Sequence, residues 1–156
     1  AVKGLAWAAD KPCLGVSTLE AMAQNIAHID GLIVGAMDAR RSQVYNAVFE
    51  ANGGELTRLT PDRAISLEEL CAQLSGKQQP ITVLGDGGAL CQRYLSEHGV
   101  KCSLAPAPLL YQNAVGVGLA AERAYARGEA VSAQELLPMY LRPAQAERLR
   151  NAKLEQ

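Results

Sequence analysis

Residues 31–59 read GLIVGAMDARRSQVYNAVFEANGGELTRL, and this run sets the architecture of the chain. Its first seven residues are apolar or glycine, which predicts a buried strand over Gly31–Met37. β-Branched and aromatic residues predict a second strand over Val44–Glu50, joined to the first by a polar turn. The Asn-Gly-Gly sequence that ends at Gly54 is a strong hairpin signal, and it predicts a third strand over Glu55–Leu59. The run therefore predicts a three-stranded antiparallel meander.

Capping residues, apolar spacing and glycine stops predict further elements on both sides of this meander. Ser66 and Glu69 match a capping box, which marks the start of a helix that follows the third strand. The expected helices cover residues 1–9, 18–28, 66–76, 88–98 and 114–126, and the expected extra strands cover residues 13–16 and 81–84.

A meander followed by helix, strand and helix is the plan of one lobe of an actin-like ATPase, the ribonuclease H-like fold of sugar kinases and Hsp70. The predicted fold class is therefore α/β, with a mixed sheet and flanking helices.

The composition limits the classes of function. The chain has 156 residues, of which 49% are hydrophobic, enough for one compact core. With 15 Lys and Arg against 16 Asp and Glu, the net charge is −1, which excludes a strongly basic nucleic-acid module. No apolar run reaches the length that spans a membrane, so we expect no membrane association and a cytoplasmic protein.

The first residues, Ala1–Ala9, look like the middle of a helix and do not start with Met. The helix is apolar nearly all round, so we expect it to be buried on more than one side. We also expect that part of the natural protein precedes it.

Cysteines and histidines give no local metal motif. Cys13, Cys71, Cys91 and Cys102 contain no C-x-x-C pair, and buried hydrophobic roles are the more common fate of such cysteines. A hydrolytic pair with His28 or His98 is not excluded by spacing, although no local signature supports it. We predict no metal, no cofactor and no catalytic residue.

The loop Gly85-Asp86-Gly87-Gly88 lies between a predicted strand and a predicted helix. Its backbone N–H groups and the helix N-terminus are able to hold a phosphate, which predicts a vestigial nucleotide loop. The alternative is a tight turn whose glycines permit a close approach of the backbone. The loop matches neither the P-loop motif nor the full dinucleotide fingerprint.

The turn that contains Asp38, Arg40 and Arg41 joins the first two strands of the meander. Two arginines in a short turn can bind phosphate or a partner carboxylate through bidentate hydrogen bonds. The alternative is a solvated hairpin tip that Asp38 stabilises. The sequence leaves both interpretations open.

Several segments together resemble the bacterial TsaB (YeaZ) family, an accessory subunit in threonylcarbamoyladenosine modification of tRNA. The resemblance covers nearly the whole chain, although most of the family's N-terminal lobe has no counterpart here. The matching segments are Lys3-Gly4-Leu5-Ala6, Pro12, Gly15-Val16-Ser17-Thr18-Leu19-Glu20-Ala21, Asp38-Ala39-Arg40-Arg41, Val44-Tyr45, Gly85-Asp86-Gly87 and Pro138-Met139-Tyr140-Leu141-Arg142.

The resemblance implies a chain with no catalytic role that pairs with a catalytic TsaD-like paralogue. That paralogue carries a His-x-Glu-Gly-His metal motif, and this chain has Thr18 and Met22 where the two histidines stand. The paralogue's Ser-Gly-Gly-His-Thr phosphate turn corresponds to residues 38–42, where arginine side chains at Arg40 and Arg41 would fill the space that the glycines leave open. Both departures predict a pseudo-enzyme.

The same resemblance assigns three parts to the chain: residues 1–28 as a remnant of the N-terminal lobe with an inter-lobe helix, 29–143 as the C-terminal actin-like lobe, and 144–156 as a charged tail. The family pairs through helices of the first lobe, so Leu5, Ala6 and Trp7 are the candidate partner contacts. The implied partners are a TsaD-like catalytic subunit and a TsaE-like ATPase, with tRNA contacted indirectly through the complex.

Two other hypotheses remain open at this stage. One is an autonomous enzyme, either an actin-fold ATPase or a glycoprotease-like metallopeptidase. The other is a homodimer, because apolar pairing surfaces often self-associate.

Overall fold

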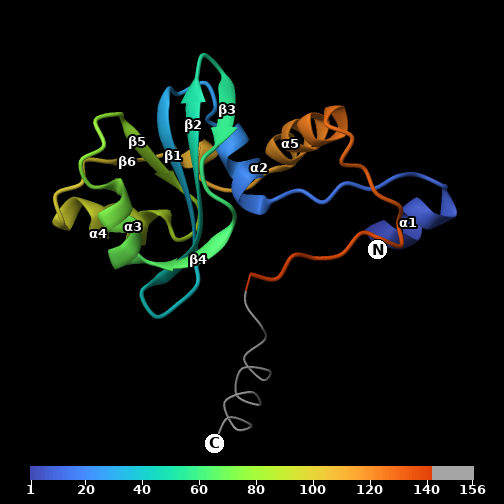
Figure 1. Ribbon diagram of the computed structural model, residues 1–156, viewed down its shortest axis with the longest axis horizontal. Coiled ribbons are helices and arrows are strands. Elements are labelled where there is room, and N and C mark those ends of the chain that lie inside the picture. The colour runs from blue at the N-terminus through green and yellow to red at the C-terminus, as the bar shows by residue number, and fades with distance from the viewer. Residues whose placement is uncertain (142–156) are drawn as a thin grey trace, which may run out of the picture.

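The computed structural model describes residues 1–141 and shows a six-stranded mixed sheet with helices on both faces (Figure 1). The charged tail expected over 144–156 lies outside the described residues, as do Arg142 and Pro143. The elements are α1 (Val2–Ala8), α2 (Thr18–Gln24), β1 (Gly31–Asp38), β2 (Gln43–Asn52), β3 (Glu55–Arg58), β4 (Arg63–Ser66), α3 (Leu67–Leu74), β5 (Ile81–Leu84), α4 (Gly88–Glu97), β6 (Ser103–Leu104), the short 3₁₀ helix η1 (Ala107–Leu109) and α5 (Ala114–Ala126).

The predicted antiparallel meander is confirmed. β1 pairs with β2 along its whole length, from Gly31 opposite Ala51 to Asp38 opposite Val44, and β2 pairs in turn with β3. Gly53 and Gly54 both have positive φ, of 57° and 85°, which a tight hairpin turn requires and which a glycine adopts without strain.

The strand order is β3-β2-β1-β5-β6, with β5 and β6 parallel to β1 and β4 antiparallel to the first half of β2. The sequence did not predict β4 or β6, because each has four residues or fewer and is defined only by pairing with a distant strand. The strand expected over residues 13–16 is wrong: Cys13 makes only an isolated bridge to Val131.

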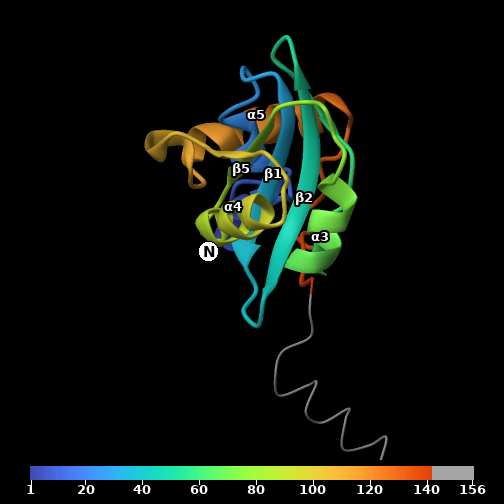
Figure 2. The same cartoon turned by 90° about the vertical axis from the view of Figure 1, so that its left-hand side faces the viewer.

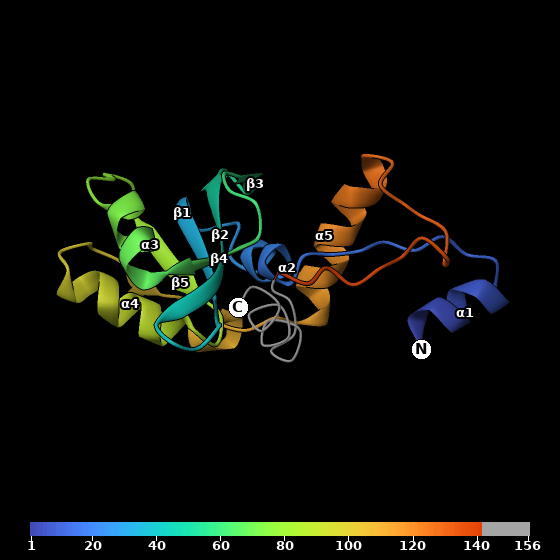
Figure 3. The same ribbon diagram turned by 60° about the horizontal axis from the view of Figure 1, so that its bottom comes forward.

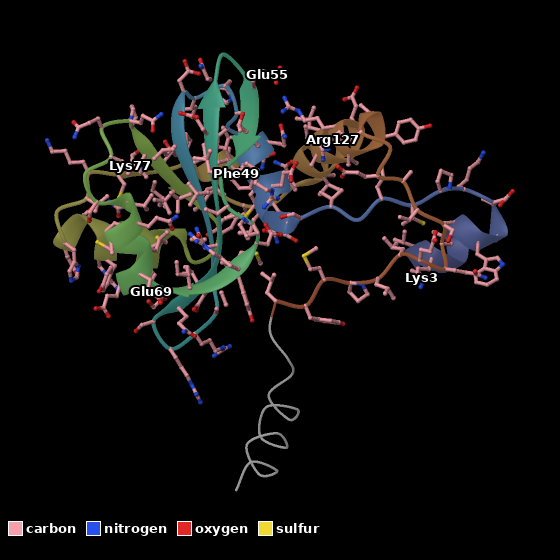
Figure 4. All side chains as sticks on the ribbon, viewed as in Figure 1. Lys3, Phe49, Glu55, Glu69, Lys77 and Arg127 are labelled. Carbon is pink, nitrogen blue, oxygen red and sulfur yellow. The ribbon has the colours of Figure 1, made fainter. Side chains whose placement is uncertain are left out.

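β1 is the central strand and is buried on both faces. On one face Leu32 and Val34 pack under α3 and α4, and on the other Ile33 packs with Phe49 under α2. Figure 2 shows α3 and α4 together on one side of the sheet, and Figure 4 shows Phe49 between the sheet and α2. Alternate residues of β1 therefore belong to two separate cores.

The helices begin where their capping residues predict. Ser66 and Glu69 make both hydrogen bonds of a capping box at α3, and Ser17 accepts a hydrogen bond from the Glu20 N–H at α2. α5 follows Asn113, whose side chain accepts from the Gly116 N–H at 2.9 Å. Within residues 1–141, no helix is long and apolar enough to cross a membrane.

α1 lies at the end of an arm that leaves the sheet, in which residues 1–16 run beside residues 130–141 (Figure 3). Lys3, labelled on this arm in Figure 4, donates from Nζ to the Gln134 carbonyl at 3.1 Å. The expectation that α1 is buried is wrong for this chain, since none of its residues is buried. Its sequence is apolar all round, but no other element of the described chain packs around it.

α5 rests on α2 through small residues, and this contact gives a direct test of the packing. A Cβ at Gly116 would lie 2.1 Å from the Ala21 carbonyl oxygen, whereas a Cβ at Gly118 would meet nothing within 4 Å. We expect Gly116→Ala to lower the free energy of unfolding by about 1–3 kcal/mol through overpacking. The matched Gly118→Ala should raise it by roughly 0.5–1 kcal/mol through helix propensity. Urea denaturation measures both, and equal effects would contradict the close packing of α2 and α5.

Candidate functional site

The structure brings together two of the predicted sites that are far apart in sequence. The Asp86 carboxylate accepts a hydrogen bond from the Asp38 N–H at 3.2 Å, and the Gly87 N–H donates to the Ala36 carbonyl at 3.1 Å. The glycine-rich loop therefore lies against the C-terminal end of β1, where the arginine-bearing turn begins. Parallel pairing of β1 with β5 places these two strand ends side by side.

The glycines of this loop are explained by packing within the protein. A Cβ at Gly85 would lie 2.2 Å from the Ala36 carbonyl oxygen, and one at Gly87 would lie 2.8 Å from the Asp38 backbone nitrogen. A Cβ at Gly88 would meet the Leu104 side chain at 3.2 Å. The missing side chains make room for the chain itself, as the tight-turn interpretation requires.

Backbone donors of the loop are also used internally. Gly85 N–H donates to the Leu110 carbonyl at 2.8 Å, and Gly88 N–H donates to the Gly85 carbonyl at 2.9 Å. Together with the Gly87 bond to β1, three loop donors that a phosphate would need already have protein acceptors. This arrangement favours a structural loop over a nucleotide cradle.

The turn after β1 has an unusual backbone. Arg40, Arg41 and Ser42 have φ values of 62°, 54° and 56°, so three successive non-glycine residues adopt the left-handed conformation. Each such residue costs roughly 1–2 kcal/mol relative to the usual helical or extended regions. The Asp38 carboxylate holds the turn by accepting from the Arg40 N–H at 2.7 Å.

Both arginine side chains in this turn are exposed. Among residues 1–141, no carboxylate forms an ion pair or hydrogen bond with the guanidinium of Arg40 or Arg41. The arginine-bearing tip, residues 38–42, therefore presents two available cations at the end of the β1–β2 hairpin, which projects beyond the sheet (Figures 1 and 2).

The other predicted site residues lie apart from this tip, on the arm. The exposed fractions of Leu5 and Trp7 are 72% and 63%, and Ala6 is half-buried. Large apolar side chains are rarely exposed together on a soluble surface without a partner.

A groove of about 850 Å³ lies between α1 and the segment 136–141. Met37 and Tyr45, which face each other across β1 and β2, contribute to its lining, so it reaches from the arm to the base of the hairpin. The wall of the groove opposite α1 includes Leu137, Met139 and Tyr140, whose exposed fractions are 75%, 78% and 82%. The sequence prediction missed this wall, although the apolar run Leu136–Leu141 was a signal for it.

An ion-pair cluster connects the floor of the groove to the sheet. Arg58 pairs with Glu20 at 2.7 Å and with Asp62 at 2.6 Å, and its guanidinium lies 4.7 Å from the centre of the Phe49 ring. Asp62 also lines the groove. The cluster ties the start of α2 to the edge of the sheet and so fixes one end of the groove.

The residues at the position of the paralogue's metal motif do not fit a metal ion. Met22 is completely buried in the core under α2, while Thr18 is exposed at the first turn of the same helix. Neither a thioether in a packed core nor a lone hydroxyl is a donor that zinc or iron favours. Across residues 1–141, no three His, Cys, Asp or Glu side chains converge as a metal site.

Cys13, Cys71 and Cys91 are buried and Cys102 is half-buried, and burial disfavours nucleophilic chemistry. Burial raises the pKa of the Cys91 thiol to about 12, so the thiol stays protonated near neutral pH. His98 stacks on Tyr94, and its Nδ1 lies 2.8 Å from the Tyr94 carbonyl oxygen. The hydrolytic cysteine–histidine pair that spacing left open gains no support from this geometry.

Known proteins are similar to this chain over nearly its whole length. The family model described as "TsaD: tRNA N6-adenosine threonylcarbamoyltransferase" matches residues 1–148. The chain belongs to the TsaD family. Its relatives within that family assign it to the TsaB (YeaZ) group, as the sequence segments predicted.

Three similar proteins support the assignment of this chain to the TsaB group. The tRNA threonylcarbamoyladenosine biosynthesis protein TsaB of Bacillus subtilis (strain 168) is 33% identical over 146 residues, which are 93% of this chain and 62% of the relative. A Pseudomonas aeruginosa protein described as similar to peptidase YEAZ has a TM-score of 0.74 and 28% identity over 90% of this chain and 64% of its own. YeaZ from Pseudomonas aeruginosa has a TM-score of 0.72 and 27% identity, and the match covers 90% of this chain and 63% of YeaZ.

These similarities confirm the predicted α/β, actin-like fold class of this TsaB-group chain. The chain spans less than two thirds of the length of each of these relatives.

The strained turn predicts an unusual effect of glycine. We expect Arg40→Gly to raise the free energy of unfolding by about 0.5–1 kcal/mol, because glycine adopts positive φ without the Cβ penalty. The matched control Arg93→Gly removes an exposed arginine from the interior of α4 and should lower it by about 1 kcal/mol. Chemical denaturation separates the two, and a loss of stability in Arg40→Gly would contradict the left-handed turn.

Proposed function

We propose that this chain acts as an accessory subunit that pairs with a TsaD-type catalytic subunit in threonylcarbamoyladenosine modification of tRNA, at the adenosine next to the anticodon. The observation that carries the proposal is the complete burial of Met22, which the family resemblance places opposite a metal-binding histidine of the catalytic paralogue. Because methionine in a packed core does not bind the metal, a TsaD-family chain of this kind depends on another subunit for the metal-dependent step. The printed name of the B. subtilis relative, a biosynthesis protein of the same modification, supports this role.

Two further features support pairing with protein. The exposed Leu5 and Trp7 leave more than one side of α1 apolar and uncovered, and the groove is lined by Val2 and Lys3 at the start of the same helix. A net charge of −1 gives the chain little long-range attraction for RNA by itself. In this proposal a TsaE-type ATPase also joins the complex, and tRNA is modified by the assembled complex in the cytoplasm.

The proposal includes the division of the chain. Residues 1–28 belong with an N-terminal lobe, and residues 29–143 form the C-terminal actin-like lobe. The exposed arm that carries α1 supports placing residues 1–16 outside the C-terminal lobe, because it contributes nothing to either core under the sheet. The α2 part of residues 1–28 does not separate in this way, since Leu19, Met22 and Ile26 belong to the core under the sheet.

Reconstitution tests the proposal. The full-length natural protein and its TsaD-type partner are mixed in a calorimeter, and threonylcarbamoyl transfer to an unmodified tRNA transcript is then measured with each subunit alone and with both. We expect a complex, and transfer that requires the TsaD-type subunit and rises when this protein is added. Absence of a complex, or zinc-dependent cleavage of a protein substrate by this protein alone, would overturn the proposal in favour of the peptidase-like alternative.

Partner contact through α1 predicts a specific loss of binding. Leu5→Asp/Trp7→Asp should weaken the complex at least tenfold, roughly the effect of removing an interface hot spot. The melting temperature of each full-length variant is measured beside its affinity, because an unchanged value separates lost partner contact from lost packing within the protein.

The control for this test is Val115→Asp/Tyr125→Asp, which changes two equally exposed apolar residues on α5. It should bind the TsaD-type subunit as the unchanged protein does. A double variant on α1 that binds normally, or one that lowers the melting temperature without affecting binding, would show that Leu5 and Trp7 are not partner contacts. Light scattering of the same variants tells whether α1 also supports a homodimer.

A further inference from the structure

We propose that the arginine-bearing tip, residues 38–42, binds the phosphate backbone of RNA through Arg40 and Arg41. The inference rests on the proposed function in tRNA modification and adds a direct contact between this chain and the RNA.

The tip keeps a costly conformation that an ordinary hairpin avoids. Turns with successive positive φ values normally use glycine, asparagine or aspartate, yet here the positions at 62° and 54° are both arginine. Strained residues of this kind cluster at functional sites, where the surrounding structure maintains them. A solvated turn with no function would gain stability by replacing either arginine with glycine.

The support of the tip is a chain of hydrogen bonds that begins outside the hairpin. Asp86, in the loop after β5, accepts from the Asp38 N–H, and the Asp38 carboxylate accepts in turn from the Arg40 N–H. On the other side, the Leu67 N–H at the start of α3 donates to the Ser42 carbonyl at 3.1 Å. The tip is thus fixed before any ligand arrives, which reduces the entropy lost on binding.

The charges around the tip leave the arginines available. Asp38 and Asp86 are the nearest acidic groups along the support, and each accepts a backbone N–H. Glu69, at the start of α3 and labelled near this end of the sheet in Figure 4, accepts from the Ser66 N–H and hydroxyl. Within the described part of the chain, none of these carboxylates pairs with a guanidinium of the tip.

The composition of the tip favours phosphate over a protein surface. Protein interfaces centre on buried aromatic and aliphatic residues, as the α1 surface does. Residues 38–43 contribute none of the exposed large hydrophobic side chains of the described chain. Two adjacent guanidinium groups on a projecting turn instead suit bidentate hydrogen bonds to phosphate oxygens, which lie on the convex backbone of RNA.

The test measures RNA affinity in the assembled complex. The full-length protein with its TsaD-type subunit is titrated with an unmodified tRNA transcript at several salt concentrations, and fluorescence anisotropy reports the dissociation constant. Arg40→Gly/Arg41→Gly keeps the backbone of the tip and removes both cations. We expect about tenfold weaker binding, and a slope of log affinity against log salt reduced by about 1.4–1.8, the change for two phosphate contacts.

Two matched variants control for charge and for geometry. Arg93→Ala/Lys101→Ala removes the same charge from exposed positions outside the tip, and should leave both affinity and salt slope nearly unchanged. Arg40→Lys/Arg41→Lys keeps the charge without the planar fork, and should retain the salt slope with a smaller loss of affinity.

Three results would overturn the proposal. Unchanged affinity and salt slope in the glycine variant would show that the tip does not touch RNA. A glycine variant that loses the TsaD-type subunit, while its remaining complexes bind RNA normally, would identify an acidic protein surface as the partner. Equal losses in the Arg93/Lys101 control would indicate a general charge effect. Failure of the proposed function looks different: the unchanged protein then forms no complex and does not raise threonylcarbamoyl transfer.

Discussion

The close approach of the glycine-rich loop to the end of β1 is the constraint on which the candidate site depends. Gly85 and Gly87 have no side chain because the Ala36 carbonyl and the Asp38 amide occupy the space that a Cβ would fill. That contact brings Asp86 to Asp38, and Asp38 in turn holds the backbone of Arg40. The position of β1 itself is fixed by burial on both faces between two hydrophobic cores. The arginine-bearing tip is therefore an extension of a central strand that is buried on both faces.

The contact between the loop and the turn also helps to explain the sequence differences that the resemblance indicates between this chain and the catalytic paralogue. The loop and the turn are still placed next to each other, as the actin-like plan requires, but loop donors are bonded internally and the turn carries arginines. Met22, which the family resemblance places opposite a metal ligand of the paralogue, is part of the core under α2. The fold is the same, but the polar groups of the loop and the turn form hydrogen bonds within the chain and support the tip. In the role that we propose, the apolar arm binds a protein partner and the cationic tip binds phosphate.

Local patterns predicted the parts of this fold that depend on local chemistry. The apolar run of β1, the β-branched and aromatic residues of β2, the glycine turn at Gly53 and the capping box of Ser66 all appear where the sequence placed them. β4 and β6 could not be predicted, since their few residues become strands only by pairing with β2 and β5. The bond between Asp38 and Asp86 joins residues 48 positions apart and follows only from the parallel pairing of β1 with β5. The burial expected for α1 is not seen among residues 1–141, because a helix that is apolar nearly all round needs apolar packing but its sequence does not say which segment or protein supplies it.

The most direct test of this account is amide hydrogen exchange at the tip of the full-length protein, compared between the unchanged chain and Asp86→Ala. If the loop supports the tip, exchange at the amides of Asp38 and Arg40 accelerates at least about tenfold in the variant, and added ATP protects neither the loop nor the tip in either protein. Unchanged exchange at these two amides in Asp86→Ala, together with protection of Gly85–Gly88 by ATP in the unchanged protein, would contradict it. That result would make the loop a nucleotide site.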